Sequence, residues 1–323
     1  MTTMTSISKE RIAELIAENE KYSPATSWLE DRYSIFNVGD NIQGYIQLDG
    51  FQFYWGDPIV TQGQPIEFLH SIVKFAEDNK CTPVFCEVSE QLEEILAGND
   101  FNYSVLSCTH EDVVDPVEAN LDVKDVQQNV RRSQRAGVDV YELTTEPTDS
   151  QREAINHGVE KWKEGRKGDQ IATASMDPFL DSVHRRFFIA QVEDKIVGIL
   201  ILTLLKDHGY QIKNCTSFPD APKGTSERLI VECLETLKKE DSHFVSFGIS
   251  ASDSMSPVHN LKGMRVTWLS GTYKSILKST GIFKRADFRS KFNVKHDPLY
   301  ICYPKHQFGL DGVQSLMKAL KTK

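Results

Sequence analysis

A carboxylate with the chemistry of an acid or base opens a helix in the second half of the chain. Ser226 and Glu227 follow the turn from Pro222 to Gly224, and the apolar spacing beyond them predicts a helix. A helix that opens beside a sheet places its first turn at the usual mouth of α/β folds. Glu227 could therefore bind an ammonium group or act as a general base toward a hydroxyl. The alternative is that it only complements the helix dipole.

Positive charges stand beside aromatic residues in the stretch from Lys284 to Phe292. Its basic members are Lys284, Arg285, Arg289 and Lys291. This composition suits phosphate contact and base stacking. If the stretch is a strand, its aromatic residues share one face and Arg289 and Lys291 share the other. The alternative interpretation is then a half-buried strand with a cationic outer face.

A second basic group lies in the middle of the chain. The polar stretch from Asp125 to Gly137 reads as a helix that ends at the glycine. Arg131 and Arg132 would lie on one side of this helix with Arg135. The group is either a nucleic-acid contact or a solvated face.

The charge of the chain is divided along its length. The whole chain carries a net charge of −9, which argues against a uniform coating for nucleic acid. From Leu261 to Lys323, however, there are 13 Lys and Arg against three acids, a local charge of +10 that leaves −19 for residues 1–260. A basic region on an acidic body attracts polyanions locally. The alternative is a merely solvated tail.

Several classes of site are disfavoured by spacing. The chain has no HExxH, GxSxG or P-loop motif, and His110-Glu111-Asp112 lies in a polar stretch without a partner that sequence can identify. The six cysteines are scattered, so reduced core thiols are expected. We expect no metal site and no bound cofactor.

The targeting signals of the sequence favour the cytosol. The longest apolar run, Ile196 to Leu205, is about half of what a helix needs to cross a bilayer. The first 20 residues are polar and lack the apolar core of a secretory signal. We therefore expect a cytoplasmic protein without a membrane span.

The elements that must position these residues form an internal repeat. The first copy has a hairpin that turns at Asp49-Gly50, a helix beginning near Pro65, and a strand from Pro83 to Val88. The second copy has a strand from Tyr210 to Phe218, the helix that carries Glu227, and a strand from Phe244 to Ile249. Two strand–helix–strand units predict an α/β (α+β) fold of tandem acetyltransferase-like (GNAT) lobes, each a mixed central sheet flanked by helices.

The boundary between the lobes is expected near Thr144 to Ser150. Residues 1–145 would form an N-terminal lobe with an N-terminal helix, and residues 146–323 a C-terminal lobe with the basic region. Acetyltransferase lobes that use coenzyme A have a glycine-rich turn for the pyrophosphate. The first repeat offers Gly63 before a proline and the second offers only Gly224, so coenzyme A is disfavoured.

Four stretches carry a resemblance to a known family: Tyr54 to Pro58, Val130 to Val138, Gly224 to Gly248, and Phe288 to Phe292 continuing to Asp297–Tyr300. Together they resemble the C-terminal catalytic domain of phosphatidylglycerol lysyltransferases and the free-standing fungal sterol aminoacyltransferases. The resemblance covers nearly the whole chain. The sequence departs from the family where Glu227 replaces the aspartate of lysyl-transferring members, which leaves the amino acid open.

The resemblance implies that the chain is an enzyme, an aminoacyltransferase. A lipid hydroxyl, of a sterol or of phosphatidylglycerol, would attack the ester that joins an amino acid to tRNA. The partners implied are aminoacyl-tRNA and a membrane lipid, with peripheral contact at the membrane. Glu227 would be the catalytic residue. Substrate-binding roles would fall to Ser226, Glu232, Ser250 and Ser252, and tRNA-binding roles to Lys284, Arg285, Arg289, Lys291, Arg131 and Arg132.

Two other classes of function stay open from the sequence. One is an N-acyltransferase that uses an acyl-coenzyme A donor and does not depend on RNA. The other is a non-catalytic module that binds tRNA or lipid, in which replacement of Glu227 leaves every function intact.

Overall fold

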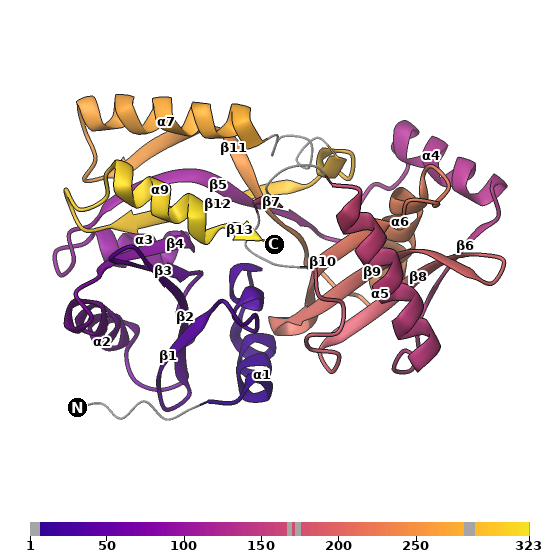
Figure 1. Cartoon of the computed structure of the whole chain (residues 1–323), viewed down its shortest axis with the longest axis horizontal. Helices are drawn as coiled ribbons and strands as arrows, with labels where there is room; N and C mark the ends of the chain where they lie inside the picture. The colour runs from indigo at the N-terminus through magenta and orange to yellow at the C-terminus, as the bar shows by residue number, and fades with distance from the viewer. Residues whose placement is uncertain (1–6, 167–169, 172–175, 281–287, 323) are drawn as a thin grey trace.

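A computed structural model describes residues 7–166, 170–171, 176–280 and 288–322. One mixed sheet of eleven strands runs through the described part of the chain, with helices on both of its faces (Figure 1). The first half contains α1 (Lys9–Asn19), η1 (Pro24–Ser27), β1 (Ser34–Val38), β2 (Asn41–Leu48), β3 (Phe51–Trp55), α2 (Pro65–Asp78), β4 (Thr82–Val88), α3 (Glu90–Ala97), β5 (Ser104–Val114) and α4 (Lys124–Arg135).

The second half begins a new series of strands that pack in the same sheet. It contains β6 (Val138–Glu142), α5 (Asp149–Glu164), β7 (Gln170–Ile171), β8 (Arg185–Val192), β9 (Lys195–Leu205), η2 (Lys206–His208), β10 (Gly209–Ser217), α6 (Thr225–Lys239), β11 (Val245–His259), α7 (Met264–Thr280), β12 (Lys295–Tyr303), α9 (Leu310–Ala319) and β13 (Lys321–Thr322). β7 and β13 form a separate two-stranded sheet.

Local sequence signals account for many of these elements. Asp49 and Gly50 have positive φ angles of 50° and 81°, as the expected hairpin turn between β2 and β3 requires. Ser89 caps α3 by accepting a hydrogen bond from the amide of Leu92. Gly137 has a φ of +79° and follows the last turn of α4, which confirms the expected end of that helix.

The two halves repeat one arrangement, which confirms the expected fold of tandem acetyltransferase-like lobes. In the first half, β1, β2 and β3 are antiparallel, and β3 then pairs in parallel with β4 across α2. In the second half, β8, β9 and β10 are antiparallel, and β10 pairs in parallel with β11 across α6. A parallel pair needs such a crossover connection, here a helix in both halves.

The halves exchange one strand each at the centre of the sheet. The strand order is β1-β2-β3-β4-β12-β5-β11-β10-β9-β8-β6. β5, from the first half, pairs with β11, while β12, from the second half, lies between β4 and β5. The two lobes therefore share one continuous sheet. The boundary near residue 145 stays a prediction.

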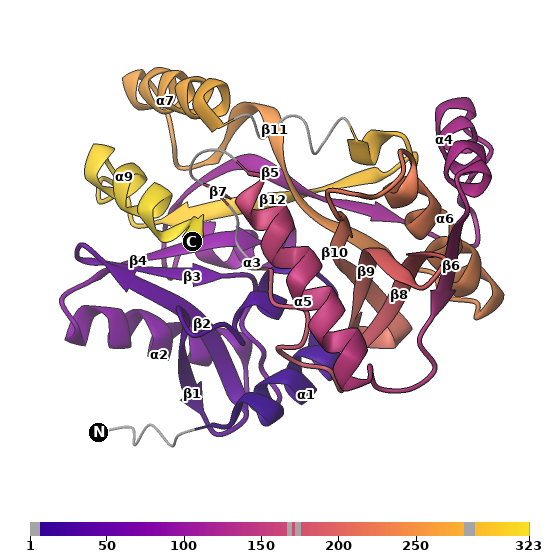
Figure 2. The same cartoon turned by 45° about the vertical axis from the view of Figure 1, so that its right-hand side comes forward.

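Side chains alternate between cores on the two faces of the sheet. In β3, Phe53 and Trp55 pack in a core with α1 and α9, whereas Tyr54 packs in a core with α2 and α3 on the opposite face. In β8, Phe188 packs with α4 and α6, and Ile189 packs with α5. Figure 2 shows α5 lying across β8, β9 and β10. No described helix is long and apolar enough to cross a membrane.

Two parts of the chain differ from their expected local structure. The polar stretch from His110 to Asp112 lies inside the central strand β5, where Glu111 and Asp112 are buried. Residues 288–290 are helical, which excludes a strand from Phe288 to Phe292. The rings of Phe288 and Phe292 lie 5.8 Å apart, as the spacing of four residues on a helical turn allows.

Candidate functional site

The parallel strands β10 and β11 separate after two residue pairs. Only Tyr210 with Val245 and Gln211 with Ser246 are in register, although both strands continue beyond these pairs. Gly248 has a φ of +82° at an irregularity in the pairing of β11 with β5. This opening in the sheet stands beside the first turn of α6, and polar side chains from several elements converge on it.

Glu227 lies in that first turn and is buried, with 8% of its surface exposed. Its Oε1 atom accepts a hydrogen bond of 2.8 Å from Asn129 Nδ2 and one of 3.3 Å from Lys291 Nζ. The carboxylate therefore does more than complement the helix dipole. It joins α6 to α4 and to the segment around Lys291.

Gly224 allows α4 to approach Glu227 this closely. It adopts a φ of +95°, and a Cβ atom at this position would lie 2.2 Å from the backbone oxygen of Asn129. α4 is held by Val126 and Val130, which are buried against α6 and its neighbours. A glycine is thus required both for the turn and for the contact that places Asn129 beside Glu227.

A second cluster forms around Asp112 of β5. Arg289 Nη1 donates to Asp112 Oδ2 at 3.1 Å and to the backbone oxygens of Gly248 and Ile249 at 3.0 and 2.9 Å. It also donates to Ser250 Oγ at 2.9 Å. Arg289 therefore binds strand carbonyls in the opening between β10 and β11.

The charge of Asp112 is stabilised by its partners. Burial opposes ionisation, but the His110 imidazole, the Ser250 hydroxyl and the Arg289 guanidinium outweigh it and hold the pKa of this carboxyl well below its usual range. Ser250 donates a short hydrogen bond to Asp112 Oδ2. Asp112 is thus a fixed negative charge in the centre of the sheet.

One short segment connects the two clusters. Phe292 is buried against Phe247, and their ring centroids are 5.5 Å apart. From this anchor Arg289 reaches Asp112, whereas Lys291 reaches Glu227. Residues 288–292 therefore contact both carboxylates, those of Asp112 and Glu227.

The remaining predicted residues divide between the two clusters and the surface. Ser226 Oγ lies 2.7 Å from Ser217 Oγ on β10, and Ser252 Oγ lies 3.1 Å from His110 Nδ1. Glu232 forms an ion pair of 3.5 Å with Arg228 along α6. The side chains of Arg131 and Arg132 are exposed on α4. Lys284 and Arg285 lie outside the described residues.

Sequence reasoning misses several members of the site. Asn129 carries no signal, because it is one polar residue in a polar helix. Glu111 is fully buried on β5 and accepts hydrogen bonds from the amide and hydroxyl of Ser23 and from Ser246. Burial raises the pKa of Glu111, which these hydrogen bonds oppose. The signal in the sequence is the adjacent pair of acids directly before Val113 and Val114, which are typical of a strand.

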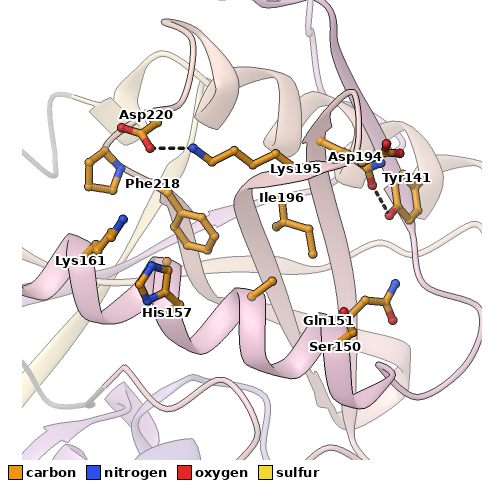
Figure 3. Close-up of a pocket in the computed structure, with 14 residues that line it drawn as sticks. Tyr141, Ser150, Gln151, His157, Lys161, Asp194, Lys195, Ile196, Phe218 and Asp220 are labelled. Atoms are coloured by element: carbon orange, nitrogen blue, oxygen red, sulfur yellow. Dashed lines mark hydrogen bonds and ion pairs between the residues drawn. The ribbon is translucent and has the colours of Figure 1, made fainter.

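A separate pocket of 390 Å³ opens on the second lobe between α5 and the turn of β8 and β9. Figure 3 shows Phe218 at its centre, with His157 and Lys161 on α5 and an ion pair of 2.7 Å between Lys195 and Asp220. None of the residues predicted from the sequence lines it. It is distinct from the clusters around Glu227 and Asp112.

The sequence matches a protein family described as phosphatidylglycerol lysyltransferase, C-terminal, over residues 13–303. No curated protein matches the chain.

The structure is similar to several solved structures. One is the C-terminal domain (DUF2156) of a candidate lysylphosphatidylglycerol synthetase from Agrobacterium fabrum, with a TM-score of 0.78 and 17% identity over 96% of this chain and 95% of that one. Another is L-PGS from Bacillus licheniformis, with a TM-score of 0.78 and 14% identity over 98% of both chains. FemX is more distant, with a TM-score of 0.55 and 8% identity over 94% of this chain and 97% of that one. At these identities the likeness concerns the fold.

Proposed function

Because the chain belongs to the family described as phosphatidylglycerol lysyltransferase, C-terminal, we propose that it transfers an aminoacyl group from aminoacyl-tRNA to a lipid hydroxyl. The family and the fold support a transferase role. The tRNA donor and the lipid acceptor are the finer parts of the proposal. The observation that carries it is the buried Glu227, held by Asn129 and Lys291 at the opening between β10 and β11.

The proposed reaction needs little covalent chemistry from the protein. The lipid hydroxyl oxygen attacks the ester carbonyl, a new ester bond forms, and the bond to the 3′ ribose oxygen breaks. The hydroxyl proton finally resides on the released tRNA hydroxyl, so no co-reactant is consumed. Because the donor ester is already activated, orientation of two substrates and stabilisation of the oxyanion supply the rate.

Glu227 is the proposed catalytic residue at this site. Its Oε1 atom already accepts from Asn129 and Lys291, which fixes the carboxylate in one orientation. The carboxylate can accept a hydrogen bond from the α-ammonium group of the amino acid or take the proton of the attacking hydroxyl. Lys291, bound to the same carboxylate, supplies a positive charge that can stabilise a terminal phosphate or the oxyanion.

The experiment that tests the proposal uses purified protein, total tRNA charged with labelled amino acids, and vesicles containing sterol and phosphatidylglycerol. We expect label in an extracted lipid band, and we expect ribonuclease to abolish it. Glu227→Gln should lower the rate by about 10²–10⁴-fold, the range for a lost acid–base group. Glu235→Gln, an exposed acid on the same helix, is the matched control and should retain the wild-type rate.

Three results would contradict the proposal. With intact charged tRNA and folded protein, no lipid label from any amino acid would exclude the reaction. Acyl transfer from an acyl-coenzyme A donor in the absence of RNA would favour an N-acyltransferase. Full activity of Glu227→Gln would remove Glu227 from the reaction.

A further inference from the structure

Three side chains that can bind a metal converge on the central strands of the sheet. His110 and Asp112 are two residues apart on β5 and therefore point to the same face. His296 of β12 is the direct partner of Asp112 in the strand register. Each side chain offers one ligand atom, and these atoms all lie within 4.8 Å of one another. We propose that His110, Asp112 and His296 bind a divalent transition-metal ion, with Zn²⁺ as the expected occupant.

The ligand atoms lie close enough together for one metal ion to contact all three. Asp112 Oδ1 lies 2.8 Å from His296 Nδ1 and 3.3 Å from His110 Nε2. Tetrahedral Zn²⁺ with bonds of about 2.0–2.1 Å holds its ligand atoms about 3.3 Å apart. His110 Nε2 is buried and faces Asp112 Oδ1 without the geometry of a hydrogen bond. A metal ion would bind both of these atoms.

The groups around the three side chains hold them in ligating orientations. Asp112 Oδ2 accepts hydrogen bonds from Arg289 and Ser250, which leaves Oδ1 directed at the two imidazoles. His110 Nδ1 lies 3.1 Å from Ser252 Oγ. If Nδ1 donates to this hydroxyl, Nε2 carries the lone pair that a metal needs. Hydrogen bonds of this kind are the usual support for metal ligands.

The ligand types select the class of metal. Imidazole nitrogen suits Zn²⁺ and the other late first-row ions, whereas Mg²⁺ and Ca²⁺ prefer oxygen ligands. Three protein ligands leave one position of a tetrahedral site for water or a substrate oxygen. The His296 side chain is 55% exposed, so the site has access to solvent. These features describe an open site rather than a closed structural one.

The competing explanation is a simple hydrogen bond between His296 and Asp112 without a metal. It accounts for the distance of 2.8 Å, whereas His110 Nε2 faces the same carboxylate oxygen at 3.3 Å without hydrogen-bond geometry. The two explanations differ in the protonation of the two imidazole rings, because metal binding requires the ligating nitrogen of each ring to be unprotonated. The inference does not depend on the proposed function, since these side chains can bind a metal without tRNA or lipid.

The test is a titration of chelator-treated protein with Co²⁺, which reports tetrahedral or five-fold coordination by its visible absorption. We expect one saturable equivalent in the wild type. His296→Gln should weaken the affinity by about 10–100-fold or more, because a ligand is lost where even a supporting group costs that much. His243→Gln is the matched control: His243 is 60% exposed and lies 3.0 Å from Asp115, so it is an ordinary histidine–carboxylate pair.

A thermal unfolding series with Zn²⁺ provides an independent measurement. Excess Zn²⁺ should raise the Tm of the wild type and of His243→Gln, but not that of His296→Gln or His110→Gln. Identical Co²⁺ affinity in the wild type and both ligand variants would overturn the proposal. So would equal loss of binding in His243→Gln, or the absence of a saturable equivalent in folded wild-type protein.

Discussion

Glu87 is a buried acid whose environment disfavours its charge. It is the unpaired residue of an irregularity between β4 and β12, with a φ of +59°, and only 7% of its surface is exposed. Burial, with repulsion from Glu111, raises the pKa of Glu87 to about 8 although Arg32 opposes the shift. Its Oε2 atom has no hydrogen-bond partner among the described residues, which suits a neutral carboxylic acid.

The raised pKa of Glu87 makes stability depend on pH. The contribution of Glu87 to the free energy of unfolding is fully present below its unfolded-state pKa of about 4.3. This contribution is lost as the pH rises toward the folded-state pKa of about 8. The side chain of the Glu87→Gln variant does not ionise, so the cost of burying it does not depend on pH. We expect the variant to be within about 1 kcal/mol of the wild type at pH 5 and more stable by about 2–4 kcal/mol at pH 8.

Urea unfolding at both pH values measures this difference. Glu90→Gln is the control, because Glu90 is exposed on the neighbouring helix α3. A stability difference between Glu87→Gln and the wild type that stays constant from pH 5 to 8 would contradict the prediction.

Single residues of the candidate site can be predicted from the sequence only where a local pattern marks them. Glu227 is marked by its place in the first turn of a helix, and Lys291 by its aromatic neighbours. His110 and Asp112 are visible as polar residues, but His296 lies 184 positions beyond Asp112. Strand pairing across that separation depends on the whole sheet, so no local pattern can bring these residues together.

The contact between α4 and α6 depends on Gly224, which has no side chain. Gly224→Ala would place a Cβ atom 2.2 Å from the backbone oxygen of Asn129 and would force a side chain into a φ of +95°. The φ strain alone costs about 1–2 kcal/mol. The overlap must also push α4 and Asn129 away from Glu227. We therefore expect Gly224→Ala to lose stability and to lose transferase activity beyond its loss of folded protein.

Gly137→Ala separates backbone strain from the helix contact. Gly137 has a φ of +79°, and a Cβ atom at that position would meet no described atom within 4 Å. This variant should lose about 1–2 kcal/mol of stability and keep the specific activity of its folded fraction. If Gly224→Ala resembles Gly137→Ala in both stability and specific activity, the contact between the helices does not position Glu227.

The elements with strong local periodicity are predictable from the sequence, whereas their partners in the sheet are not. The hairpin at Asp49-Gly50 and both strand–helix–strand units are confirmed. The exchange of β5 and β12 has no counterpart in the sequence pattern. A strand's own residues specify which of its faces is buried, but they do not specify which neighbour it pairs with. The segment around Arg289 alternates as a strand would, although its aromatic spacing of four also fits a helical turn.

The exposed arginines of α4 are the proposed contact for tRNA at the scale of the whole molecule. α4 projects at the end of the sheet that carries α6 and β6, far from α7 and α9 (Figure 1). Asn129 contacts Glu227, and the exposed Arg131 and Arg132 follow on the same helix. We propose that a tRNA whose 3′ end reaches Glu227 contacts these arginines. The region from Leu261 to Lys323, with its local charge of +10, is a second basic region that attracts polyanions.

The salt dependence of tRNA binding measures whether these arginines contact phosphate. Each lost phosphate contact reduces the magnitude of the negative slope of log K against log salt by about 0.7–0.9. The double variant Arg131→Ala, Arg132→Ala should therefore lower the slope by about 1.4–1.8 if both residues bind phosphate. Lys74→Ala with Lys80→Ala, exposed near the end of α2, changes the net charge equally and should leave the slope unchanged. Equal slopes in both double variants would show that α4 presents a solvated face, so that only the total charge governs tRNA binding.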